Sequence, residues 1–160
     1  MPTMNRFLGV LAVIYILVSG CTVRSSEVTS PNGHIRLAFA LDGNNRMTYQ
    51  VSVGDTVFIA PSLLGFTAKD GVNLAEGFKV INTDFTTHDE TWTQPWGENK
   101  TIRNHYNEMA VHLSDTTNAK LTLRFRIFDD GLGFRYEYEV PGADSILVTD
   151  ELTAFNLSLI

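Results

Sequence analysis

Hydrophobic side chains recur at every second position in several stretches of this sequence, and this period limits the fold more than any other feature. In residues 35–41, large apolar side chains alternate with Arg36, Ala38 and Ala40, and residues 47–53 repeat the alternation. Period two sends successive side chains to opposite faces of a strand, so one face can be buried and the other solvated. No long stretch shows a helical period, although residues 99–111 are mixed and could hold a turn of helix. The pattern predicts antiparallel strands.

Turn residues separate the predicted strands at short intervals. Residues 42–45 read Asp-Gly-Asn-Asn, a cluster that favours a hairpin between the first two strands. A short strand is expected over residues 56–59 and is predicted to end at Pro61, because proline cannot donate to a sheet ladder. Many short strands with frequent turns predict an all-β fold, an antiparallel β-sandwich. Further strands are expected over residues 78–85, 109–113, 121–128 and 132–140.

The clearest hairpin turn is Asp129-Asp130-Gly131, because an Asp-Gly pair suits the positive φ angles of tight turns. We expect Asp129 to pair with Leu132, which leaves the type of loop open. This register puts the apolar side chains of both strands on one face. It sets Phe125 opposite Tyr136, Arg124 opposite Glu137 and Arg126 opposite Arg135.

The first residues have the features of a secretory signal rather than of a fold. Arg6 is the only charged side chain before residue 24, and residues 8–18 are apolar but too few to span a bilayer. Ser19 and Gly20 precede Cys21, the one cysteine of the chain, and this resembles a bacterial lipoprotein signal. We expect a signal peptide over residues 1–20, lipid on Cys21, a polar tether over residues 21–30 and a domain over residues 31–160. The alternative is a plain signal peptide followed by a chance cysteine.

Charge narrows the possible partners and location. The 160 residues carry 12 basic and 18 acidic side chains, a net charge of −6, which argues against nucleic acid as a partner. No acidic residue follows Cys21 directly, which favours a periplasm-facing anchor. We therefore expect a periplasmic protein, held on the bacterial outer membrane by lipid alone or secreted into the periplasm.

Aromatic and hydrogen-bonding side chains gather in residues 92–98 and 103–108. Sugars need such a mixture, because aromatic faces cover their C–H surfaces while amides, guanidinium groups and carboxylates bind their hydroxyls. The alternative is a polar strand edge with two core tryptophans. If the segment is extended, its side chains alternate between two faces and cannot all line one pocket. The substrate-binding candidates are Trp96, Glu98, Arg103, His105, Asn107 and Glu108.

The sequence gives little support for a metal site or a catalytic site. His88, Asp89 and Glu90 are adjacent, so a strand would send them to opposite faces, and no compact set of three ligands is visible. Glycoside hydrolysis usually needs two facing carboxylates. Glu98 and Glu108 are the first pair to compare, but no motif marks them. We therefore assign no catalytic residue, metal ligand or cofactor to this chain.

Four motifs stand in a fixed order along the chain. They are Val-Thr-Ser-Pro-Asn-Gly at 28–33, Asp-Glu-Thr-Trp with Pro-Trp-Gly-Glu at 89–98, Ile-Arg-Asn-His-Tyr-Asn-Glu at 102–108, and Phe-Asp-Asp-Gly-Leu-Gly-Phe-Arg-Tyr-Glu at 128–137. Together they resemble the N-terminal domain of family 97 glycoside hydrolases, the group of periplasmic α-glucosidases and α-galactosidases. The likeness covers about residues 27–157.

The resemblance implies a three-part enzyme, with a β-supersandwich, a catalytic (β/α)8 barrel and a C-terminal β domain. The catalytic residues and a calcium ion belong to the full-length enzyme. The family's sandwich continues past Ile160, so we expect an incomplete supersandwich here, inactive alone, that packs on the barrel and shapes a pocket for α-glycosides. The alternative is a stand-alone carbohydrate-binding or structural lipoprotein.

Overall fold

The computed structural model describes residues 25–158, and the signal peptide and Cys21 lie outside these residues. The described chain is built almost wholly of strands, with a single short 3-10 turn, Lys69–Gly71. Among residues 25–158, no helix has the length and apolar character to cross a membrane. The strands are β1 Ser26–Thr29, β2 Ile35–Leu41, β3 Met47–Val53, β4 Thr56–Leu63, β5 Phe66–Ala68, β6 Lys79–Thr93, β7 Thr101–Ser114, β8 Lys120–Ile127, β9 Leu132–Glu139 and β10 Val148–Glu151.

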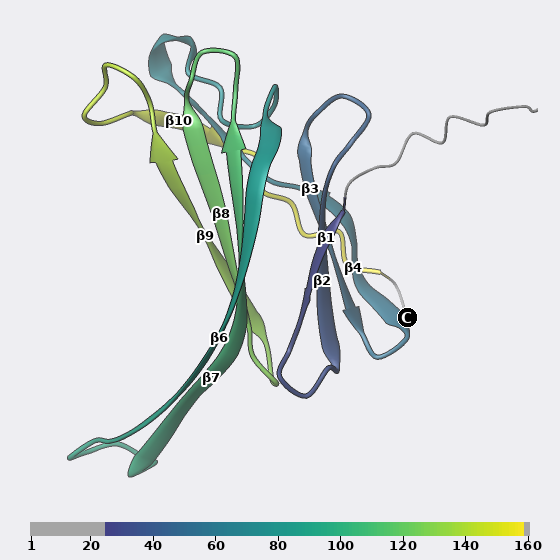
Figure 1. Ribbon diagram of the computed structural model, residues 1–160, viewed down its shortest axis with the longest axis vertical. Helices are drawn as coiled ribbons and strands as arrows, with labels where there is room; N and C mark the ends of the chain where they lie inside the picture. The colour runs from purple at the N-terminus through teal and green to yellow at the C-terminus, as the bar shows by residue number, and fades with distance from the viewer. Residues whose placement is uncertain (1–24, 159–160) are drawn as a thin grey trace, which may run out of the picture.

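Two four-stranded antiparallel sheets face each other (Figure 1), one in the order β1-β2-β3-β4 and the other β6-β7-β8-β9. The core lies between them, and Phe39 and Phe125 meet there with ring centroids 6.2 Å apart. Both rings are fully buried. The predicted all-β sandwich is therefore confirmed.

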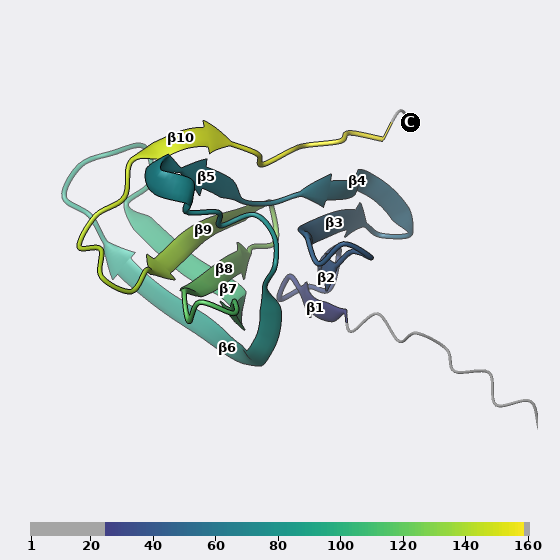
Figure 2. The same cartoon turned by 90° about the horizontal axis from the view of Figure 1, so that it is seen from above.

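A third element links the two sheets. β5 pairs with β10, and the chain then continues beside β4 (Figure 2). The N–H of Ala154 donates to the carbonyl of Leu63, and the Tyr49 hydroxyl donates to the carbonyl of Ala154, both at 2.9 Å. The C-terminal residues thus cover the edge that β4 would otherwise expose.

The first hairpin has the predicted strands and turn. Leu41 pairs with Met47, and the carboxylate of Asp42 accepts the N–H groups of Asn44 and Arg46 at 2.8 and 2.9 Å. Asn45 has a φ of 57°, which asparagine tolerates better than most residues.

β4 does not stop at Pro61, so that prediction was wrong. Tyr49 lies opposite Ser62 and Val51 lies opposite Ile59, which leaves an irregularity in the β4 ladder between those pairs. Pro61 falls at this bulge, where no ladder hydrogen bond is needed from it. The expected tether also ends sooner, because Ser26–Thr29 forms β1 and pairs with β2.

The hairpin of β8 and β9 has a different register from the predicted one, while the type of its loop had been left open. Ile127 lies opposite Leu132 and Phe125 opposite Phe134, so every predicted pair is shifted by two residues. The N–H of Phe128 donates to the carbonyl of Gly131 at 2.8 Å and closes a four-residue loop. A shift of two leaves each side chain on its face, so the predicted faces hold while the predicted partners were wrong.

β6 and β7 are far longer than expected. They extend to Thr93 and back from Thr101, and residues 99–111 hold no turn of helix. The two strands leave the sandwich together and form the long projection at the lower left of Figure 1.

Candidate functional site

The projection is a two-stranded arm. β6 and β7 pair along their whole length, but β8 pairs only with residues 107–114 of β7. Residues 88–106 therefore form an arm with no third strand. Its strands, residues 88–93 and 101–106, rise about 3.3 Å per residue and reach about 20 Å. A two-stranded hairpin is marginally stable in water, so the arm depends on contacts between its side chains.

Contacts on both faces of the arm hold it together. One face of the arm continues the side of the sheet β6–β9 that faces the core. On this core-side face, the Nε and Nη2 atoms of Arg103 donate to the two carboxylate oxygens of Asp89 at 2.8 and 2.7 Å. The hydrogen bond from Arg103 is the main cause that lowers the pKa of Asp89. On the opposite face, the His88 ring stacks on Tyr106 with centroids 5.0 Å apart. The arm is thus braced near its base and at mid-length.

The tip of the arm presents an aromatic ring to solvent. Trp96 is 83% exposed, and Gln94, Pro95 and Gly97 surround it. Gly97 has a φ of 125°, and a Cβ there would lie 2.5 Å from the Gln94 amide nitrogen. That amide donates to the carbonyl of Asn99 at 2.9 Å, which closes the turn. The turn needs glycine and leaves the indole face free for stacking.

The structure divides the six candidate residues among separate places. Trp96 and Glu98 lie at the tip, whereas Arg103 and His105 lie along the core-side face of the arm. Asn107 shares that face at the base, where its amide donates to the carbonyl of Thr29 at 2.9 Å. The predicted alternation is confirmed, and no single pocket contains all six.

Glu108 points to the opposite face and is 8% exposed. It lies ten residues along the chain from Glu98, across a strand that rises about 3.3 Å per residue. Facing carboxylates of glycosidases lie about 5–9.5 Å apart. Glu98 and Glu108 are therefore not such a pair.

An ion-pair network surrounds Glu108 on the outer face of the sheet β6–β9. Its two carboxylate oxygens accept from Arg124 and from Arg126, the latter at 2.7 Å. Arg124 also donates to both oxygens of Glu137, at 2.9 and 3.1 Å. Arg135 donates from its Nε to the same Glu137 at 2.8 Å. The network crosses three strands, β7, β8 and β9.

The network shifts the titration of its carboxylates. Hydrogen bonds from Arg124, with help from Arg135, lower the pKa of Glu137 to about 2. Burial opposes ionisation of Glu108, but hydrogen bonds from Arg126 and Arg124 outweigh it and lower its pKa. Both groups are therefore ionised at neutral pH.

The sequence predicted one contact of this outer face and missed the others. Arg124 and Glu137 were expected to interact across β8 and β9, and they do so diagonally. The link to Glu108 requires β7 beside β8, which the sequence pattern did not specify. Tyr106, whose ring lies 4.6 Å below the Arg126 guanidinium, gave no separate signal.

The described residues present no group of three or more His, Cys, Asp or Glu side chains that could hold a metal ion.

Two antiparallel sheets packed face to face, with a braced arm that carries an exposed tryptophan, define the class of this protein as an all-β sandwich domain. Within that class, a family model described as Glycosyl-hydrolase 97 N-terminal matches residues 28–159. The chain belongs to this family of glycoside hydrolase N-terminal domains, as its four motifs predicted.

Individual proteins of known sequence or structure are also similar to this chain. The chain is 23% identical over 133 residues to a retaining alpha-galactosidase of Bacteroides thetaiotaomicron, covering 83% of this chain and 19% of the relative. It superposes with a TM-score of 0.77 and 32% identity on a Glycoside Hydrolase Family 97 enzyme from Pseudoalteromonas sp. strain K8 in complex with panose. That match covers 82% of this chain and 20% of the enzyme. A beta-arabinopyranosidase structure shares the fold, with a TM-score of 0.76, 24% identity, and coverage of 83% of this chain and 21% of its own.

The chain thus spans about a fifth of the length of these relatives.

Proposed function

We propose that this chain acts as the N-terminal domain of an α-glycoside hydrolase, packs on a catalytic (β/α)8 barrel and shapes its sugar pocket. The arm is the observation that carries the proposal, because it projects about 20 Å beyond the sandwich and ends in the exposed Trp96. A partner domain beside the sandwich would give this indole a place next to a bound sugar. The relatives support a carbohydrate role, since one Family 97 enzyme binds panose and another structure holds acarbose.

The six candidate residues have different roles in this proposal. Trp96 stacks on the sugar ring, with Glu98 beside it at the tip. Arg103 is held by Asp89 and positions the arm, while His105 lies on the same face. Asn107 ties the base of the arm to β1, and Glu108 anchors the outer network rather than touching sugar.

A chimera tests the proposal. The N-terminal domain of the Pseudoalteromonas enzyme is replaced by residues 27–158 of this chain, and hydrolysis of an α-glucoside is measured. We expect an active chimera, whose kcat/KM falls about tenfold in Trp96→Ala, the loss of one stacking contact of about 1–1.5 kcal/mol. Trp92→Ala is the matched control, because Trp92 lies within the arm rather than at its tip. Equal activity of Trp96→Ala, Arg103→Ala and the parent chimera would refute the role of the arm.

A stand-alone carbohydrate-binding or structural lipoprotein is the second candidate, favoured by the accessible indole of Trp96. Reading the genomic DNA downstream of codon 160 separates the two. A barrel-coding stretch in any frame supports the first, and a stop codon without such a stretch supports the second. In both cases we propose a periplasmic, lipid-anchored protein that contacts the membrane through Cys21 alone.

A further inference from the structure

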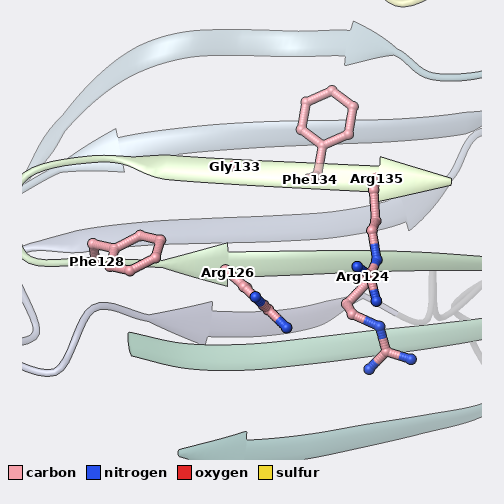
Figure 3. A pocket seen from close by; sticks show the side chains of 6 residues that line it. All are labelled: Arg124, Arg126, Phe128, Gly133, Phe134 and Arg135. Carbon is pink, nitrogen blue, oxygen red and sulfur yellow. The ribbon is translucent and has the colours of Figure 1, made fainter. Parts of the chain in front are cut away.

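A basic pocket lies on the outer face of the sheet β6–β9, away from the tip of the arm. It has a volume of about 220 Å³ and lies over β8, β9 and the loop between them. In Figure 3 the three arginines lie on one side of the strands, and the Phe134 ring points to the other side. The pocket is lined by Arg124, Arg126, Phe128, Gly133, Phe134 and Arg135.

The charges in this pocket do not balance. Three guanidinium groups meet two carboxylates, those of Glu108 and Glu137. Arg124 donates from all three of its nitrogens to these carboxylates. Arg126 gives only its Nε to Glu108, and within residues 25–158 its Nη groups have no carboxylate partner. One positive charge is therefore in excess over the three arginines, and Arg126, whose side chain is 41% exposed, offers its Nη groups to a further carboxylate.

The space beside Arg126 exists because its cross-strand neighbour is Gly133. A Cβ at Gly133 would meet no atom within 4 Å, and its φ lies outside the left-handed region. The backbone therefore does not require glycine there, and the missing side chain leaves the pocket open. Phe128 forms an apolar wall that is held against Tyr106, with ring centroids 5.2 Å apart.

We propose that this basic pocket binds one acidic sugar residue, with the sugar carboxylate on the Nη groups of Arg126 and the C–H face of the ring on Phe128. Guanidinium groups bind carboxylates through paired charge-assisted hydrogen bonds, and aromatic rings cover apolar sugar faces. The volume is below the range of about 300–1,000 Å³ for drug-sized ligands, which fits a single ring rather than a chain. The proposed binding of an acidic group is argued from the pocket alone. The proposal that this group belongs to a sugar rests on the proposed function.

Nuclear magnetic resonance titration of the ¹⁵N-labelled chain tests this proposal. Galacturonate and glucuronate are the probes, galactose and glucose are the neutral controls, and acetate supplies a carboxylate without a ring. We expect the uronates to shift the Gly133 amide and the Arg126 Nε–H signal at concentrations where the neutral sugars and acetate do not. The absence of any shift with uronates would overturn the proposal. An equal shift with acetate would show that the sugar ring is not recognised, and an equal shift with the neutral sugars would show that the charge is not recognised.

Variants locate the binding. Gly133→Leu fills the pocket without removing any charge, and we expect it to weaken uronate binding at least about tenfold, the loss of about one charge-assisted hydrogen bond. Gly131→Leu is the matched control, since a Cβ there also meets open space but lies outside the pocket lining. If thermal melting shows Gly133→Leu to be unfolded, Arg126→Gln replaces it with the same expected loss. Unchanged affinity in the folded variant overturns the site.

This test fails separately from that of the proposed function. The chimera measures α-glucoside hydrolysis and responds to Trp96, whereas the titration responds to Gly133 on another face. If the chain does not bind uronates but the chimera is active, only the inference about the pocket is refuted.

Discussion

At the scale of single residues, Glu108 shows how a carboxylate can be nearly buried on a sheet face that points away from the core. Its side chain is 10% exposed, and both oxygens accept from arginines of the neighbouring strand. Removing such a charge leaves two guanidinium groups with one partner fewer, which costs more than the pair itself contributed.

We therefore expect Glu108→Gln to lower the free energy of unfolding by about 2 kcal/mol, less than for a fully buried pair because Arg126 is partly solvated. Urea unfolding monitored by circular dichroism measures the change. Glu139→Gln is the control, since Glu139 and its partner Lys120 are both mostly exposed and such pairs contribute about 0.5 kcal/mol or less. Equal effects of the two substitutions would show that burial of Glu108 does not matter.

Glu137 makes the stability depend on pH. Its pKa is about 2 in the folded chain and near 4.5 in the unfolded chain, so the unfolded state takes up the proton first as the pH falls. The free energy of unfolding contributed by this group is complete above about pH 5 and is lost as the pH falls towards 2. We expect Glu137→Gln to flatten the acid limb of a stability-against-pH curve from urea unfolding. An unchanged slope would contradict the assignment to Glu137.

At the scale of elements, the arm should open independently of the sandwich. Gly97→Ala introduces a Cβ at a φ of 125° and 2.5 Å from the Gln94 amide, so the turn must distort. We expect faster hydrogen exchange at amides of residues 88–106 and unchanged protection in β8. Gly43→Ala is the control, because Gly43 is also in a hairpin turn but has open space and no positive φ. Loss of protection throughout β8 would show that arm and sandwich unfold together.

The arm also shows why some strands could be predicted from the sequence and others could not. The strands β2 and β3 were predicted with their bounds, because each buries one face and the period of two is visible. Distal β6 is largely exposed on both faces, and its residues 88–93 are polar apart from Trp92, so no period of two marks the strand. Mixed exposed segments of this kind resemble loops in the sequence although pairing with a neighbour makes them strands.

The candidate site was predicted in part for the same reason. The residue types and their division between two faces follow from strand alternation, which depends only on sequence. The network of Glu108 depends on which strands are neighbours, and the pocket at Gly133 depends on a register that the loop set two residues from the expected one. Neither long-range pairing nor loop length is encoded in a local pattern.

At the scale of the whole molecule, the sandwich is one core to which the arm and the C-terminal residues are added, and the lipid on Cys21 is the proposed membrane attachment. Covalent geometry limits how far that lipid can lie from the sandwich, since Ser26, the first residue of β1, is five positions after Cys21 in the chain. At about 3.5 Å per step, these five steps span about 18 Å at most. A lipid on Cys21 would therefore hold the sandwich close to the bilayer surface.

We expect the expressed chain to incorporate labelled palmitate and to sediment with membranes. Cys21→Ser should abolish the label and release the chain into the soluble fraction, because no other cysteine can carry the lipid. Ser19→Ala keeps a small residue before the cysteine and serves as the control. Labelling of Cys21→Ser would contradict the lipoprotein interpretation.

The regular ladder between β6 and β7 within the arm has a consequence for how the reach of this domain can evolve. In the arm, residues 88–93 lie opposite residues 101–106 without a bulge. Deleting two residues from each strand would shorten the reach by about 7 Å and keep every remaining side chain on its face. Deleting one from each would turn the tip over and point Trp96 the opposite way. Insertions and deletions in the arm are thus acceptable in even steps only, and its length can vary among relatives as a series of discrete sizes.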